Sequence, residues 1–480
     1  MNKFLFTFAA SFLMLATSCV KDYDIDQLNS STLTDAVDNF TTKEDIQMLP
    51  SNIQDLSASD AQKVAQIFIN KSRTRGNDLL LSESTEVKNT VPILSHNGSI
   101  AMYAVNFKNG GFMIISATTS FFPILAVVEN GEYNNSGYLE VAENYIEDLA
   151  EKVMLAKTGE LKIDCTIEWS AYKDFESTTP STRASDEYLN ALYSWMEEQN
   201  YGTYRIYKLK SCKDLLPEKV YNEFLQAVKS EDPWEGTEYC GENTAYVVER
   251  TTENLINVGP LLSTNWNQDN KAYNISKPDK KVPTGCVTIA TGQLMRYFQY
   301  PSTFAWNNMS TGGGYHNTEL DNFLTTLRAQ LGVNDDGGAS IDDAERVLKG
   351  YGYQVTKQNH DVAKVFNELA YRRKPVYARG QKGALQGGHA WVIDGLYHSE
   401  STVKYTLYRL SDVHYPEFKY TDAENADPYS NYTSLTMFHM NWGWGGGGNG
   451  MFMDSNITVT LQSGTHNFYY DRKELFLTRP

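Results

Sequence analysis

Residues 283–290 have the sequence Pro-Thr-Gly-Cys-Val-Thr-Ile-Ala, and the prediction of the fold starts from this stretch. A proline and a glycine lead into a pattern in which apolar residues recur at helical spacing as far as Pro301. The pattern predicts a buried helix that begins at Cys286. Because the positive end of a helix dipole lowers the pKa of a thiol, Cys286 is a candidate nucleophile. The alternative is that Cys286 is only the first core residue of that helix, since free cysteines are often buried.

A catalytic thiol needs a histidine base, and His389 has the most suitable sequence context among the eight histidines. Two glycines precede His389, and the apolar run after it predicts a buried strand that would hold the ring on a rigid element. His439, two residues before Asn441, is the competing candidate. The other histidines lie mostly in polar, loop-like sequence, which is typical of solvated side chains.

A third motif, residues 438–450, is rich in glycine and tryptophan. The Asn441 amide can accept the imidazole N–H and hold one tautomer, while Trp442 can shield that hydrogen bond from water. The glycines at 443–448 formally fit a dinucleotide-binding pattern, but the sequence at 451–453 is typical of a strand rather than a helix. We therefore expect the glycines to form a wall of a substrate cleft.

Together, Gly-Cys opening a helix, Gly-Gly-His-Ala opening a strand and Asn-Trp-Gly-Trp-Gly further on resemble the streptopain family of papain-like cysteine peptidases. The resemblance implies an α+β fold, in which a helical part carries the cysteine and an antiparallel sheet carries the histidine. It also implies hydrolysis of protein or peptide substrates through a Cys286/His389 ion pair, without metal or cofactor. Residues 259–268 look like the start of the family's mature enzyme, which makes Gln268 a candidate oxyanion-hole donor beside the Cys286 N–H.

The N-terminal part also resembles this family, because residues 103–112 and 124–131 are similar to its inhibitory propeptide. The resemblance implies a zymogen, whose smaller α+β pro-domain acts as an intramolecular inhibitor. We expect a signal peptide at 1–18, a polar tether at 19–55, the pro-domain at 56–176, a Ser/Thr/Pro-rich linker at 177–185, an insert or extended pro-region at 186–250 and the peptidase domain at 251–480. Arg183 and Arg250 are both candidates for the maturation site.

The first 18 residues contain one lysine and an apolar run of signal-peptide length, followed by Cys19. Small residues immediately before a cysteine resemble a bacterial lipobox, so we expect Cys19 to be lipidated and the chain to reach the cell envelope. A conventional signal peptide with an incidental Cys19 is the alternative.

Composition narrows the remaining classes of function. The formal net charge is −17, which gives no electrostatic basis for binding nucleic acid. Five cysteines are too few for a disulfide scaffold, although Cys212 and Cys240 could pair in an oxidising envelope. A surface adhesin or glycan-binding lipoprotein would explain the 31 tyrosines but not the three motifs. A thiol acyltransferase would use the same covalent chemistry.

Overall fold

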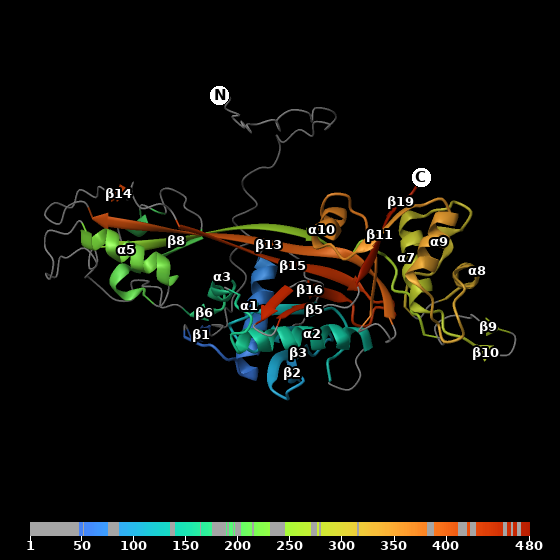
Figure 1. The fold of residues 1–480 in the computed structure, drawn as a ribbon, viewed down its shortest axis with the longest axis horizontal. Coiled ribbons are helices and arrows are strands. Elements are labelled where there is room, and N and C mark those ends of the chain that lie inside the picture. The colour runs from blue at the N-terminus through green and yellow to red at the C-terminus, as the bar shows by residue number, and fades with distance from the viewer. Residues whose placement is uncertain are drawn as a thin grey trace, which may run out of the picture. The chain divides into compact units, whose positions relative to one another are not determined.

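The computed structural model describes residues 48–50, 52–74, 86–134, 140–163, 165–174, 189, 192–194, 196, 203–213, 216–230, 245–269, 276–277, 280–313, 316–381, 388–410, 420–422, 429–454, 458–461, 464–467 and 472–480 (Figure 1). The predicted signal peptide, Cys19, the predicted linker with Arg183, and Cys240 lie outside these residues.

The N-terminal unit is a four-stranded antiparallel meander with two helices. Its elements are α1 (Ala58–Thr74), β2 (Val87–Leu94), β3 (Ile100–Phe107), β4 (Phe112–Ser116), β5 (Ile124–Val128) and α2 (Glu140–Lys157). Strands β3 and β4 form a hairpin that turns at Gly110 and Gly111. Both glycines have positive φ, 90° and 81°, a conformation that side chains other than glycine disfavour.

The last part of the predicted tether, which ended at residue 55, contains regular structure. Leu49 is fully buried, and its strand β1 (Leu49–Pro50) pairs in parallel with β6 (Lys173–Asp174), which follows the short helix α3 (Thr166–Ser170). Because this region is mostly polar, the sequence did not indicate that the Leu49 side chain would be buried in the core.

A helical layer carries the predicted nucleophile. It comprises α7 (Cys286–Phe298), the short helix η2 (Trp306–Asn308), α8 (Thr318–Leu331) and α9 (Ile341–Gly350). Buried side chains of α7, α8 and α9 form one hydrophobic cluster with Val392 of the sheet. Ser340 and Asp343 form a capping box at the start of α9.

The facing antiparallel sheet carries the predicted base. In order across the sheet, its strands are β11 (Gln354–Asn359), β19 (Lys473–Thr478), β12 (Val376–Gln381), β13 (Gly388–Leu410), β15 (Tyr429–Asn441) and β16 (Gly450–Met453). Helix α10 (Val362–Ala370) packs on β13. Two further pairs form separate two-stranded sheets: β9 (Ser276–Lys277) with β10 (Lys280–Lys281), and β17 (Thr458–Leu461) with β18 (Gly464–Asn467). The expected α+β class, with cysteine on a helix and histidine on a sheet, is confirmed.

The N-terminal meander continues the same sheet, because β5 pairs with β16. One hydrophobic cluster includes Phe112 and Val128 from the meander together with Trp391 and Phe438 from the sheet. In Figure 1, α1, α2 and β2–β5, in blue and teal, adjoin the orange and red strands β15 and β16. The inhibitor-like segment is therefore docked on the part that carries the site.

The predicted insert contributes β7 (Thr203–Lys208), the short helix η1 (Leu209–Ser211), α5 (Glu218–Ser230) and the first part of β8 (Ala245–Val258). Strand β8 lies between β7 and β13, while β14 (Tyr420–Asp422) pairs with β13. The boundary predicted at 250/251 falls inside β8, whose residues on both sides of the boundary pair with β13. Cys212 is a free buried thiol.

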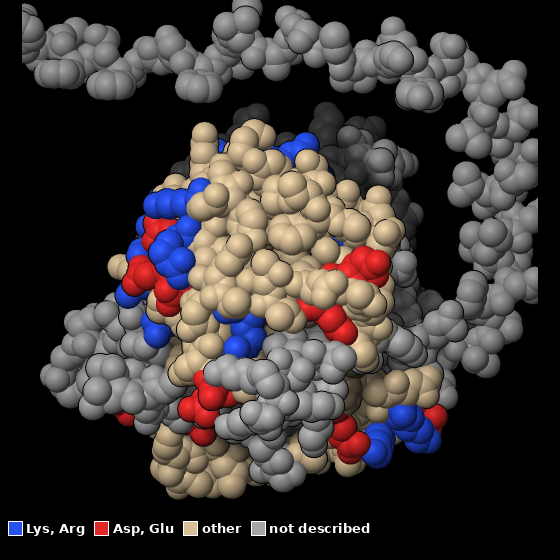
Figure 2. Space-filling view, turned by 90° about the vertical axis from the view of Figure 1, so that its right-hand side faces the viewer, with Lys and Arg blue, Asp and Glu red and all other residues tan. Residues whose placement is uncertain are grey.

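On the face drawn in Figure 2, blue and red side chains lie together on the left, and most of the described surface is tan, without charged residues. Around α9, Lys349 pairs with Glu345, and Arg346 pairs with Asp343. Among the described residues, no helix is both long and apolar enough to cross a membrane.

Candidate active site

Cys286 begins α7, as the sequence predicts. The preceding residue, Gly285, has φ 86°, and a Cβ there would lie 2.3 Å from the carbonyl oxygen of Gly337. Only glycine fits such a position, because any side chain would be both strained and in collision with backbone. Gly285 thus lets the chain turn sharply into the helix with the thiol at its first residue.

The Cys286 thiol is not activated in this state. The residue is half-buried, and desolvation of the thiol raises its pKa, which outweighs the stabilisation of a thiolate by the N–H groups of Ala390 and Val287. The positive charge of Arg379 also favours the thiolate and so acts to lower the pKa of Cys286. The thiol is therefore the favoured form at neutral pH.

His389 lies on β13 with its imidazole enclosed by aromatic rings. The ring stacks on Trp391, with the ring centroids 6.3 Å apart and the planes at 13°. It also stacks on Trp444, with the centroids 6.2 Å apart and the planes at 14°. Its Nε2 lies 2.9 Å from the backbone carbonyl oxygen of Trp442. Burial lowers the pKa of His389 to about 4, so the ring is neutral, and Nε2 donates its proton to that carbonyl.

The expected Cys286/His389 ion pair is not formed in this structure. No hydrogen bond or ion pair between these two side chains occurs in the part of the chain that is described. Burial favours the neutral form of both groups, which is why the sequence-based expectation of an ion pair fails here. With Nε2 as donor, however, Nδ1 of His389 is an acceptor and has the protonation needed to take the thiol proton.

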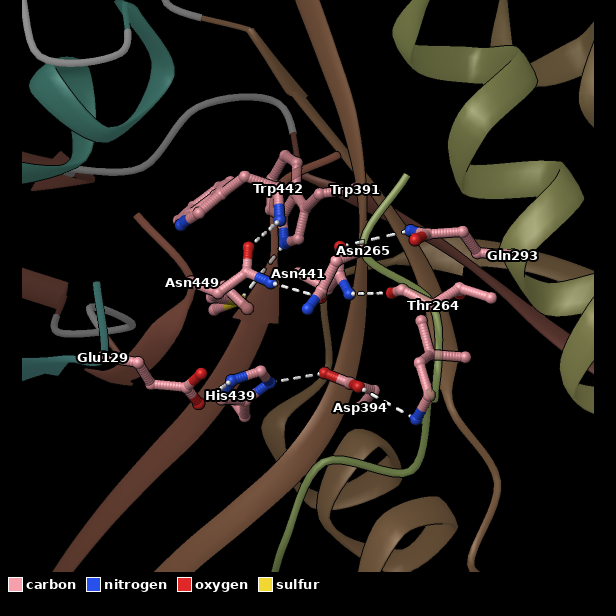
Figure 3. Close-up of polar contacts among 12 residues, drawn as sticks. Glu129, Thr264, Asn265, Gln293, Trp391, Asp394, His439, Asn441, Trp442 and Asn449 are labelled. Carbon is pink, nitrogen blue, oxygen red and sulfur yellow. Dashed lines mark hydrogen bonds and ion pairs between the residues drawn. The ribbon is translucent and has the colours of Figure 1, made fainter. Parts of the chain in front are cut away.

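Asn441 does not orient His389 through its side chain, which corrects the expectation from the sequence. Its Nδ2 donates to the carbonyl oxygen of Thr264 at 2.9 Å, and its Oδ1 accepts from Gln293 Nε2 at 3.2 Å and from the Gly443 N–H at 3.3 Å (Figure 3). The carbonyl of the next residue, Trp442, takes the predicted role. Asn441 instead ties the glycine-rich loop to α7 and to the segment at 264.

Trp442 is buried, with its ring 6.4 Å from that of His389 and tilted by 40°. Its backbone N–H donates to Asn449 Oδ1 at 3.1 Å, so both backbone polar groups of Trp442 are fixed. Sequence reasoning placed Trp442 beside the base but missed Trp391, Trp444 and Asn449. The two tryptophans were visible inside the His and Asn-Trp motifs, whereas no sequence signal marked Asn449.

Gln268 lies between the two catalytic elements. Its N–H donates to the carbonyl oxygen of Gly443 at 2.9 Å, and its own carbonyl accepts from the Gly285 N–H at 3.3 Å. The side-chain Oε1 is buried without a hydrogen-bond partner among the described residues. These contacts place the Gln268 backbone beside both motifs, and the role of its side chain as oxyanion donor stays a prediction.

His439, the competing base, belongs to a different cluster. Its Nδ1 lies 2.5 Å from Asp394 Oδ1, and its Nε2 lies 2.8 Å from Glu129 Oε1 of the N-terminal unit (Figure 3). Both ring nitrogens are engaged by carboxylates, so His439 has no nitrogen left to accept a thiol proton.

A cysteine at the start of a buried helix, facing a histidine of an antiparallel sheet, defines a papain-like cysteine/histidine site. Comparison of the chain with known protein families supports this class. Residues 266–323 and 338–452 match the model described as "Peptidase C10 family", and residues 53–153 match that described as "Spi protease inhibitor". The chain carries a Peptidase C10 domain preceded by a Spi-type inhibitor domain, which confirms the resemblance to streptopain zymogens.

Curated relatives include streptopain of Streptococcus pyogenes serotype M1, with 27% identity, and that of serotype M28 (strain MGAS6180), also with 27%. Each alignment covers 33% of this chain and 53% of the relative, so the chain spans about half the length of the curated relatives it matches.

Solved structures with a similar arrangement include two of Prevotella intermedia. A prointerpain A fragment has a TM-score of 0.39 and 17% identity, covering 80% of this chain and 98% of the fragment. Active interpain A has a TM-score of 0.30 and 21% identity, covering 46% of this chain and 94% of the other.

Proposed function

We propose that this chain is the precursor of a cysteine endopeptidase, in which Cys286 and His389 hydrolyse peptide bonds after the N-terminal inhibitor domain leaves. The observation that carries the proposal is the tautomer of His389. Because Nε2 donates to the Trp442 carbonyl, Nδ1 is available to accept the thiol proton.

In the proposed reaction, Cys286 Sγ attacks the carbonyl carbon of the scissile bond while His389 takes the thiol proton. The oxyanion is bound by the Cys286 N–H and by the side-chain amide of Gln268, whose backbone is hydrogen-bonded to Gly285 in the turn before the thiol. His389 then returns the proton to the leaving amine. It next activates the water that releases the acyl group from Cys286.

The inhibitor domain accounts for latency in this proposal. The thiol pKa is raised and the imidazole pKa is lowered to about 4, so the docked form holds neutral groups rather than a reactive ion pair. Removal of the domain would admit water to the site and thereby favour both charged forms. Activity should therefore appear only after cleavage of the precursor.

Export and lipid attachment at Cys19 complete the proposal, on the strength of the apolar run before it and the small residues next to it. A Cys19→Ala variant expressed in a bacterium that lipidates proteins tests this step. We expect incorporation of a labelled fatty acid into the parent and none into the variant, whereas equal labelling would contradict lipidation at Cys19.

Hydrolysis of an unfolded protein substrate by the matured chain tests the enzyme activity. Cys286→Ala should abolish cleavage, while Cys212→Ala, which removes another free thiol, should leave it unchanged. A thiol acyltransferase would instead transfer the acyl group to an added amine faster than to water.

A further inference from the structure

His439 holds two carboxylates that come from different parts of the chain. Asp394 belongs to β13, whereas Glu129 directly follows β5 of the inhibitor domain. His439 and Asp394 are buried, and the Glu129 side chain is only 19% exposed. In Figure 3 the three side chains form one line across the junction between the two domains.

The geometry defines the charge of His439. Nδ1 lies 2.5 Å from one carboxylate oxygen and Nε2 lies 2.8 Å from the other, and carboxylates accept but do not donate. A neutral imidazole has only one N–H, so both contacts are hydrogen bonds only when the ring is an imidazolium. The carboxylates correspondingly raise the pKa of His439 to about 10, against the effect of burial.

The two carboxylates differ in what else they do. Asp394 also accepts the Leu262 N–H at 3.1 Å through Oδ2, and its carbonyl accepts the Leu261 N–H at 2.7 Å. Asp394 is thus held within the catalytic part whether or not the inhibitor domain is present. Glu129 is the partner that leaves with the inhibitor domain.

The pairing of β5 with β16, next to the Glu129–His439 contact, does little to select one strand sequence over another. Val128 of β5 is in register with Gly450 of β16, where a Cβ would lie 2.3 Å from the Val127 carbonyl oxygen. Gly450 therefore permits close approach, but backbone hydrogen bonds to a sheet edge accept many sequences. A buried charge pair next to that edge distinguishes one strand from another.

Glu129 also reaches the loop that positions the base. Its N–H donates to the Asn449 carbonyl oxygen at 2.9 Å, and Asn449 Oδ1 accepts the Trp442 N–H at 3.1 Å. The carbonyl of Trp442 holds His389. One residue of the inhibitor domain is thus bonded both to His439 and to the loop that carries the His389 acceptor.

We propose that the carboxylate of Glu129, bound by the imidazolium of His439, is the recognition residue by which the inhibitor domain is held on the catalytic domain. This inference rests on the proposed zymogen function. The charge pair adds selectivity to an interface that also contains the β5–β16 pairing and the shared hydrophobic cluster.

The test uses the full chain with Cys286→Ala, so that self-cleavage plays no part. Glu129→Gln keeps the size and removes the charge, and Glu132→Gln is the matched control, because Glu132 pairs with Lys88 inside the inhibitor domain. Two measurements are made: amide hydrogen exchange in segments 124–128 and 450–453, and the titration of His439 by nuclear magnetic resonance.

We expect Glu129→Gln to speed exchange in both segments at least tenfold and to lower the pH at which His439 titrates, while Glu132→Gln stays within twofold of the parent. Exchange and titration in Glu129→Gln that match Glu132→Gln would overturn the proposal. Since the chain is inactive by design, this result is independent of whether the enzyme hydrolyses peptides.

Discussion

Nε2 of His389 lies 2.9 Å from the backbone carbonyl oxygen of Trp442, so a main-chain group fixes the tautomer of the proposed base. A backbone acceptor cannot be deleted by substitution of its own side chain. The position of that carbonyl depends instead on the hydrogen bonds of Asn441 and Asn449 around it. Variants of these residues should therefore act through loop geometry.

Asn441→Ala should lower stability rather than change the acid–base chemistry. The substitution leaves the buried carbonyl of Thr264 and the amide of Gln293 without their partner, which costs about 1–3 kcal/mol of unfolding free energy. Urea unfolding should show this loss, while the pH profile of activity keeps its shape. Asn322→Ala, on the exposed side of α8, is the control. Unchanged stability with a shifted pH profile would show that the Asn441 side chain orients the His389 ring.

Gly285→Ala should damage the site through the backbone. The positive φ alone costs about 1–2 kcal/mol with a Cβ present, and the collision with the Gly337 carbonyl adds to it. We expect a fall of at least about 2 kcal/mol in unfolding free energy and slower alkylation of Cys286. Gly350→Ala, where a Cβ meets no atom within 4 Å, should stay within about 1 kcal/mol of the parent. Equal stability of the two variants would refute the packing argument.

Trp444→Ala should raise the pKa of His389. Burial holds this pKa at about 4, and Trp444 covers one face of the ring. Water admitted by the substitution favours the imidazolium, so the titration should move toward the ordinary value of about 6.5. Nuclear magnetic resonance of the Cys286→Ala chain measures it, with the exposed Tyr371→Ala as control. A pKa that stays near 4 would show that Trp444 does not exclude water.

The stability of the precursor should fall at alkaline pH because of His439. Its pKa is raised from 6.5 to about 10 in the folded chain, so its contribution is complete below about 6.5 and is lost as pH rises through about 10. Unfolding free energies of parent and His439→Gln should therefore differ most below about pH 6.5, by an amount on the order of a few kcal/mol. The difference should shrink between pH 7 and pH 10. A constant difference across that range would contradict the assignment.

Arg250→Gln should leave maturation unchanged. Arg250 lies within β8, opposite Tyr204 on one side and Lys404 on the other, so its backbone is paired at both edges. A peptidase binds its substrate as an extended segment with free backbone groups. Gel analysis should show processing at the same rate and position as in the parent. Loss of processing would restore Arg250 as the maturation site, and Arg183 remains the candidate from the sequence.

Local patterns predicted the elements that carry the chemistry. The helix begins at Cys286 because Gly285 and an apolar stripe specify it, and the strand begins beside His389 because an apolar run follows two glycines. Each of these signals lies within a dozen consecutive residues. The α+β class was predicted through the family resemblance that these local motifs carry.

Contacts between distant segments could not be read in this way. Thr264 meets Asn441, and Glu129 meets His439, across long stretches of chain that no periodicity links. The orienting carbonyl of Trp442 has no residue-type signal, because every residue has a backbone carbonyl. The ion pair expected from chemistry also depends on burial, which the sequence does not disclose.

The most direct test of the central claim, that Cys286 is the nucleophile of a peptidase made as an inactive precursor, is a hydrolysis assay with the purified full chain. The parent, Cys286→Ala and Cys212→Ala are followed by mass spectrometry with an unfolded protein substrate, before and after removal of the inhibitor domain. We expect cleavage by the parent and by Cys212→Ala only after removal, and none by Cys286→Ala at any time. Undiminished cleavage by Cys286→Ala would contradict it.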